Sequence, residues 1–172
     1  MPTLTGKPGQ WAIQARSFRI GCAPLSHNFW TLAEPGGNVV DQLHGLAVDP
    51  GTGQAKAIGN SSHRLQVVQD ATIAWSLQPG QPVAVCAAGR EAEIKARWQT
   101  ALNAVPALNA LQIPYPDLWQ HFFRANSNSV FNTLGQIMGF DSPASLLPTV
   151  APGISRILSR EIVSRYRYLP LA

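Results

Sequence analysis

Two serines and two asparagines directly precede an apolar helix pattern in the stretch RANSNSVFNTLGQIMGF, which begins at Arg124. A hydroxyl at a helix N-terminus lies in the favourable field of the helix dipole, and free backbone N–H groups there can bind an oxyanion. Ser127 and Ser129 are therefore candidate nucleophiles, and each would need a general base to take its proton. The simpler interpretation is that these side chains only cap the helix.

Two of the four histidines could supply that base. His27 and His44 lie in the predicted strands HNFWTLAE and VVDQLHGLAV, which are joined by the turn signal PGGN. A hairpin closed at this turn places Thr31 opposite Gln42, and side chains along a strand alternate between the two faces of a sheet. We therefore expect His27, Gln42 and His44 to share one face, with His27 as the base and Gln42 or His44 orienting its ring. Structural roles for both histidines are the alternative.

The first half of the chain has the pattern of an antiparallel sheet. From Arg16 to about Gly89, short apolar runs alternate with turns rich in glycine and proline, which predicts five or six strands. The segments SFRIGCAPL, HRLQVVQD, ATIAWSLQ and PVAVCAAG are the other predicted strands. The segment PGTGQAK lacks the spacing of a phosphate-binding loop, and Asp49 before it is predicted to be a turn cap or a surface charge.

Beyond Gly89 the apolar period becomes helical. We expect one helix that Pro106 ends or kinks, a second over 128–139, and a C-terminal amphipathic helix over 153–168 that carries several arginines. Residues 1–16 are predicted to be an N-terminal arm. Strands in one block and helices in the next predict a single α+β domain over 1–172, in which an antiparallel sheet is followed by and packed against about three helices.

The composition narrows the classes of partner. Of the 172 residues, 45% are apolar and 13% are charged, which is typical of a chain with a packed core. The formal net charge is +4, but no run of like charges marks a nucleic-acid site. The longest apolar stretch, ALNAVPALNALQI, is too short to span a membrane. The N-terminus lacks the apolar core of a signal peptide, so we expect synthesis in the cytoplasm. Export without a cleaved leader stays open.

No metal or cofactor is expected. Cys22 and Cys86 both lie in strand-like apolar runs and are predicted to be buried thiols, although a disulfide between them stays open. No Cys/His spacing of the metal-binding type occurs. The remaining histidines, His63 and His121, are predicted to be non-catalytic.

The histidine strand, the polar strand that follows it and the later segment ANSNSVF together resemble the circularly permuted papain-like hydrolases, which include NlpC-type peptidases and lecithin:retinol acyltransferase-like proteins. In that superfamily the histidine precedes the nucleophile, which is normally a cysteine at a helix N-terminus. The resemblance implies a permuted papain-like fold with Ser127 at the nucleophile position, His27 as base, and Gln42 or His44 as the orienting residue. It covers roughly 26–46 and 126–139 of this chain.

Serine in place of cysteine is a departure, because a serine hydroxyl stays protonated where a cysteine at a helix N-terminus can ionise. Three alternatives remain open: an active serine variant, a degenerate relative used for binding, and a deliberate replacement of cysteine by serine in a toxic or self-cleaving enzyme.

The resemblance implies a hydrolase that cleaves an amide, such as a peptidoglycan stem peptide, or an ester of a lipid, and an antibacterial secreted effector is a fitting setting. A protein partner, such as an inhibitor or a secretion component, fits the same setting. In a hydrolase, the Ser127 hydroxyl should lie within about 4 Å of a His27 ring nitrogen. The alternative is a non-catalytic interaction, adaptor or immunity-type protein that uses the C-terminal helix or the aromatic residues near Tyr115–Phe123.

Overall fold

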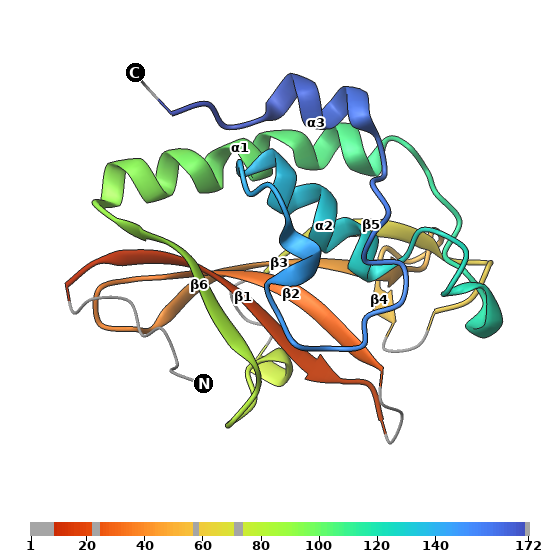
Figure 1. Cartoon of the computed structure of the whole chain (residues 1–172). Coiled ribbons are helices and arrows are strands. Elements are labelled where there is room, and N and C mark those ends of the chain that lie inside the picture. The colour runs from red at the N-terminus through yellow and green to blue at the C-terminus, as the bar shows by residue number, and fades with distance from the viewer. Residues whose placement is uncertain (1–8, 22–24, 57–58, 71–73, 171–172) are drawn as a thin grey trace.

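The fold is α+β, as predicted. The computed structural model describes residues 9–21, 25–56, 59–70 and 74–170. Its sheet has the strand order β4-β3-β2-β1-β6, with β5 also paired to β3, and every pairing within it is antiparallel (Figure 1). The described strands are β1 (Trp11–Arg19), β2 (Ser26–Ala33), β3 (Val39–Val48), β4 (Ala55–Lys56), β5 (Arg64–Gln69) and β6 (Val83–Gly89). The helices are α1 (Glu91–Asn109), α2 (Ser127–Ile137) and α3 (Arg160–Tyr166), with the short 3-10 helices η1 (Ala74–Ser76), η2 (Leu118–Gln120) and η3 (Pro143–Ser145).

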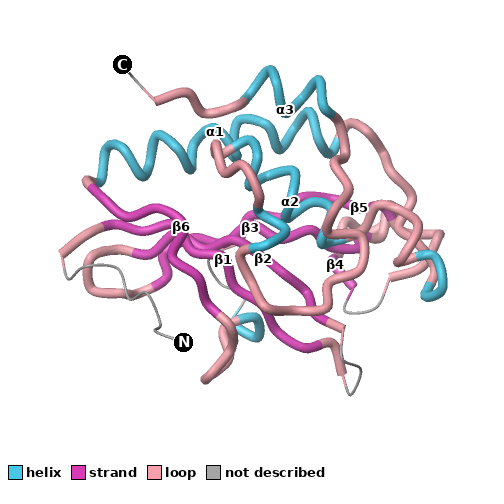
Figure 2. Tube along the Cα trace, in the orientation of Figure 1, coloured by secondary structure: helices cyan, strands magenta, loops and turns pink. Residues whose placement is uncertain are grey.

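The sheet has two buried faces of different character. The helices α1, α2 and α3 all lie on one side of it (Figure 2). On that side Ile13, Leu43 and Val67 join the main apolar core, and the Trp30 indole donates to the carbonyl of Phe131 in α2. The short helix η1 lies on the other side (Figure 1). We call these the helix face and the opposite face.

The register between β2 and β3 agrees with the sequence prediction, because Thr31 lies opposite Gln42. The connection is longer than a two-residue turn, since the Glu34 N–H bonds to the carbonyl of Asn38. A bulge near Val40 then shifts the pairing by one residue and restores the predicted register. The bulge therefore keeps the polar residues of both strands on one face.

Two sequence predictions in the first half of the chain differ from the structure. Strand β1 begins at Trp11, inside the predicted 1–16 arm, because it pairs with both β2 and β6 and so fills the middle of the sheet. Residues 1–8 lie outside the described residues. The segment ATIAWSLQ contains the helical turn η1 where a strand was predicted, and 71–73 lie outside the described residues.

Two helix boundaries also differ. Helix α1 runs through Pro106 to Asn109, and the buried residues Ala104 and Leu108 on either side of the proline hold its last turn in the core. Helix α3 begins at Arg160, not at 153, because Ser159 caps it. The preceding segment is instead tied to α2, where Thr133 accepts a hydrogen bond from the Leu158 N–H.

Helix α2 matches its prediction closely. The residues predicted for its inner face are all buried, namely Val130, Phe131, Leu134, Ile137 and Met138. Gly139 follows with φ +83°, and the Phe140 N–H bonds back to the carbonyl of Gly135, as in a helix ended by a left-handed residue.

The close contact of α2 with β3 depends on a glycine. A Cβ at Gly45 would lie 2.6 Å from the Val130 Cβ and 2.8 Å from the Ser127 carbonyl oxygen. We expect Gly45→Ala to destabilise the fold by about 2 kcal/mol, because α2 would have to move off the sheet. Urea unfolding measures this. Gly36→Ala is the control, since its nearest contact would be 3.5 Å. Equal midpoints for the two variants would contradict the tight packing.

Candidate functional site

A chain of buried polar side chains crosses the opposite face. The His27 Nε2 lies 3.1 Å from the His44 Nδ1, and the His44 Nε2 lies 3.1 Å from the Gln42 Oε1. The Ser76 hydroxyl, from η1, donates to the same Gln42 oxygen. The three residues predicted to form one cluster therefore do so, and the structure adds Ser76.

Gln42, at the end of this row of hydrogen bonds, fixes which group donates and which accepts at each step. An amide oxygen only accepts hydrogen bonds, so the His44 Nε2 must carry a proton and donate it to Gln42. The His44 Nδ1 is then an acceptor, and the His27 Nε2–H donates to it. Both imidazoles are thus neutral Nε2–H tautomers, each oriented by the next residue. This is the orienting arrangement that the sequence predicted for a base.

The histidines are enclosed by aromatic rings. His27 packs against Phe18 and Phe29, and His44 stacks on Phe29 with the ring centroids 4.5 Å apart. Burial lowers the pKa of His27 to about 4. Burial, together with the neighbouring His27, lowers the pKa of His44 to about 2. Both rings therefore stay uncharged at neutral pH, because the enclosure disfavours the charged form.

Ser127 lies on the helix face. Its carbonyl oxygen approaches Gly45 from the side where a Cβ would also meet Val130, so β3 presents Gly45 to α2 and His44 to the opposite face. The Ser127 side chain hydrogen-bonds that of Tyr115, whose ring lies on the same side as Ala47. The sheet therefore lies between the Ser127 hydroxyl and the His27 ring.

The structure consequently does not bring the predicted nucleophile to the predicted base. His27, His44 and Gln42 meet each other, and Ser127 does not join them. Tyr115 does not replace the missing base, because burial raises its pKa and keeps the phenol protonated. Sequence reasoning missed Tyr115 and Ser76, since neither has a local pattern that marks it as a partner.

The other polar residues at the start of α2 have structural roles. The Asn126 side chain accepts from the Asn128 N–H, and the Ser129 hydroxyl accepts from the Asn126 N–H, which together form a capping box. Asn128 accepts from the Asn28 N–H and donates to the Ser26 carbonyl, so it ties α2 to β2. The capping interpretation thus accounts for Asn126 and Ser129, and Asn128 links the helix to the sheet.

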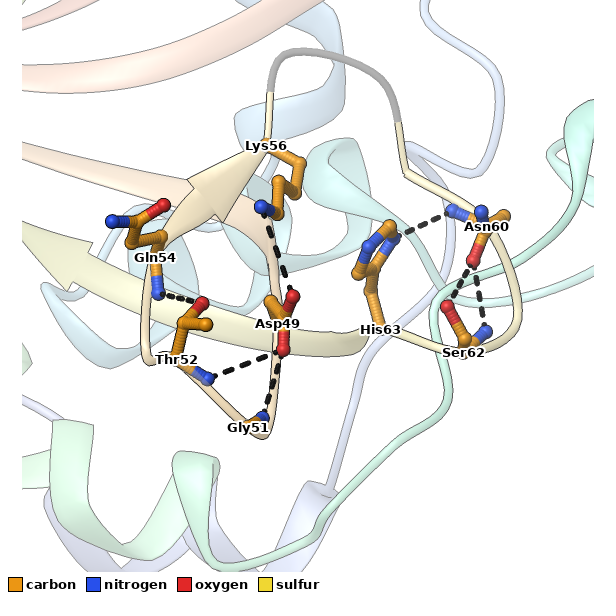
Figure 3. A network of polar contacts seen from close by, with 8 residues as sticks. All are labelled: Asp49, Gly51, Thr52, Gln54, Lys56, Asn60, Ser62 and His63. Atoms are coloured by element: carbon orange, nitrogen blue, oxygen red, sulfur yellow. Dashed lines mark hydrogen bonds and ion pairs between the residues drawn. The ribbon is translucent and has the colours of Figure 1, made fainter.

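The segment PGTGQAK, which superficially resembles a phosphate-binding loop, forms a turn, as predicted. The Asp49 carboxylate accepts from the N–H groups of Gly51 and Thr52 and lies 3.7 Å from the Lys56 ammonium (Figure 3). The two N–H donors are the main cause that lowers the Asp49 pKa. With a carboxylate filling the turn, an anionic phosphate is not favoured there.

The described residues offer neither a cluster of metal ligands nor a reactive thiol near the histidines. In the described part of the chain, no three His, Cys, Asp or Glu side chains gather where they could hold a metal ion. Cys86 is a free, half-buried thiol, and burial raises its pKa to about 11, which makes it a poor nucleophile. Cys22 lies outside the described residues.

Comparisons of this chain with protein-family models, with curated proteins and with solved structures gave no match. The resemblance to permuted papain-like hydrolases therefore stays a prediction.

The buried histidines should make the fold acid-sensitive. An unfolded His27 takes up a proton near pH 6.5, but the folded one does so only near pH 4. Stability is therefore full above pH 6.5 and falls as the pH drops towards 4, by about 3 kcal/mol for this residue. Urea unfolding between these pH values should show this loss.

His27→Gln should reduce that pH dependence without abolishing it, because the buried His44 still resists protonation, whatever the effect of the variant at neutral pH. His63→Gln is the control, because His63 lies in a loop with its ring accepting from the Asn60 N–H (Figure 3). An unchanged pH slope in the His27 variant would show that its ring is not held neutral.

Proposed function

We propose that this chain is a non-catalytic interaction protein that docks onto an anionic membrane surface through an aromatic tip. The aromatic tip consists of Trp119, Phe122 and Phe123. Its exposure is the observation that carries the proposal. The separation of Ser127 from His27 by the sheet supports a binding role over hydrolysis, because a serine without a base is inert.

The aromatic tip is unusually open to solvent. Trp119, Phe122 and Phe123 are 84%, 54% and 74% exposed. They lie in and just after η2, between α1 and α2, and this segment projects at the right-hand edge of the molecule, away from the helices (Figure 1). Large aromatic side chains that gather on a surface usually mark an interaction site.

The shape and chemistry of the tip favour a bilayer over a flat protein interface. A projecting loop can enter the headgroup region without burying any other part of the protein. Tryptophan is enriched at membrane interfaces, where one side of its ring is apolar and its N–H stays hydrated. Arg124 follows directly and is exposed, and the chain carries a formal charge of +4, which anionic lipids attract.

The gain in free energy is large enough for reversible docking. Burying the three rings would remove roughly 400 Å² from water, which is at most about 10 kcal/mol before the costs of immobilisation. Peripheral docking also agrees with the helices, since none in the described ranges is long and apolar enough to cross a membrane.

The absence of nucleophilic catalysis is testable at Ser127. We expect no covalent labelling of the chain by a fluorophosphonate probe, because neither His27 nor the protonated Tyr115 can take the Ser127 proton. Intact-mass spectrometry measures the label. Labelling that disappears in Ser127→Ala would overturn the non-catalytic proposal and restore the hydrolase.

Docking is testable with vesicles. The chain should co-sediment with phosphatidylcholine vesicles that contain phosphatidylserine, and less with phosphatidylcholine alone. Trp119→Ser combined with Phe123→Ser should weaken binding at least about tenfold, because most of the inserted area is lost. Added salt should weaken binding of the unmodified chain, because it screens the attraction of Arg124.

Leu169→Ser is the matched control, because Leu169 is 75% exposed and lies near the C-terminus, outside the tip. It should leave sedimentation unchanged. Equal loss in both variants, or no binding to either kind of vesicle, would contradict membrane docking. Binding of the tip to another protein would then be the remaining alternative.

A further inference from the structure

A pocket of about 440 Å³ lies at the end of the sheet where β1 stops and β2 begins. Its walls come from four segments: the end of β1, the start of β2 at Ser26, the loop before β6, and the 148–150 loop. It lies on the helix face, because Thr149 from its wall donates to the Asn28 side chain on that face. Its lining includes Ser17, Arg19, Thr149 and the prolines Pro79, Pro82 and Pro148.

Two buried polar groups beside this pocket have no hydrogen-bond partner among the described residues. They are the Ser17 hydroxyl and the Asn28 amide nitrogen, and the two residues are 0% and 1% exposed. Ser17 and Asn28 lie directly opposite each other on β1 and β2. Their side chains therefore project side by side on the helix face.

A buried polar group without a hydrogen-bond partner lowers the stability of a folded protein. The Asn28 amide nitrogen can only donate, and the Ser17 hydroxyl can donate to the same acceptor. The Asn28 oxygen is already used by Thr149. Both groups thus lack an acceptor, and Ser17 is the one of the two residues that lines the pocket.

The charge of the pocket also favours a ligand that accepts hydrogen bonds. Arg19 is the one charged side chain among the described residues that line it, and no carboxylate is among them. Arg19 is exposed at the mouth, on the same face of β1 as Ser17. The guanidinium favours an anion, and its planar fork matches a carboxylate.

One part of the pocket wall favours an apolar body, while Ser26, Gln78 and Gln81 add polar groups elsewhere. Pro79, Pro82 and Pro148 line it together with Val150, and none of these side chains can form a hydrogen bond. The volume far exceeds that of a bare ion and lies within the range of small-molecule sites.

We propose that this pocket binds a small organic carboxylate, with the carboxylate accepting from Ser17 and Arg19 and an apolar group lying against the prolines. The inference is independent of membrane docking, because it rests on different residues and a different part of the molecule.

The probe is N-acetylphenylalanine, and its uncharged analogue N-acetylphenylalaninamide is the matched control ligand. Titration into the ¹⁵N-labelled chain should shift the backbone amides of Ser17, Arg19 and Thr149 and the side-chain amide of Asn28. The amide analogue should bind at least about tenfold more weakly, because it lacks the charge that Arg19 pairs with.

Two variants separate binding from folding. Arg19→Gln should weaken the acid about tenfold with no change in melting temperature, since the side chain is exposed. Ser17→Ala should also weaken binding, but it should not lower the melting temperature, because it removes a hydroxyl that has no partner. Arg160→Gln, an exposed arginine on α3, is the control and should bind as the unmodified chain does.

Three results would overturn the proposal. They are equal shifts for acid and amide, shifts confined to residues outside the pocket, and no shift at about 10 mM ligand. A fall in melting temperature for Ser17→Ala would show that ordered water already satisfies the hydroxyl, and this too would count against a vacant ligand site.

Discussion

The alternation of side chains along β2 and β3 decides which functional groups of this molecule can meet. Each strand presents one residue to the helices and the next to the opposite face, so His27 and His44 point away from α2 while Gly45 and Trp30 meet it. Both faces are buried. The polar chain from His27 to Ser76 is therefore sealed between the sheet and η1, and no rotation of a side chain can carry an imidazole to Ser127.

The start of α2 shows how a nucleophile-like pattern can be explained by packing alone. A helix that enters the core against a sheet must satisfy its free N–H groups without water. Asn126 and Ser129 do this for the helix itself, and Asn128 extends the same network to β2. Gly45 lets the helix backbone approach closely enough for these bonds to form. The clustered small polar residues are thus explained by the hydrogen bonds that a buried helix N-terminus requires.

The polar groups of this molecule differ in whether their hydrogen bonds are complete. His27, His44 and Gln42 each meet a partner, and the aromatic rings around them keep both imidazoles neutral. The Ser17 hydroxyl and the neighbouring Asn28 amide nitrogen lack partners among the described residues, and Ser17 lines a pocket. A satisfied buried network favours a stable fold, whereas unsatisfied groups at an opening favour a ligand. Together with the exposed aromatic tip, this contrast is why both proposed binding surfaces lie away from the histidines.

Local patterns in the sequence determined most of the elements and, through the hairpin turn, the shared face of His27, Gln42 and His44. They also determined the inner face of α2 and its end at Gly139, since both depend on residue types within one or two turns of helix. Only the tertiary structure decided which face of the sheet α2 covers, because a strand with both faces buried has no polar side to mark its outside. For the same reason, pairing in the middle of the sheet, not local composition, made a strand of Trp11–Arg16, and packing of the last turn carried α1 past Pro106. The separation of Ser127 from His27 is a property of the sheet as a whole, and no spacing of residues along the chain contains it.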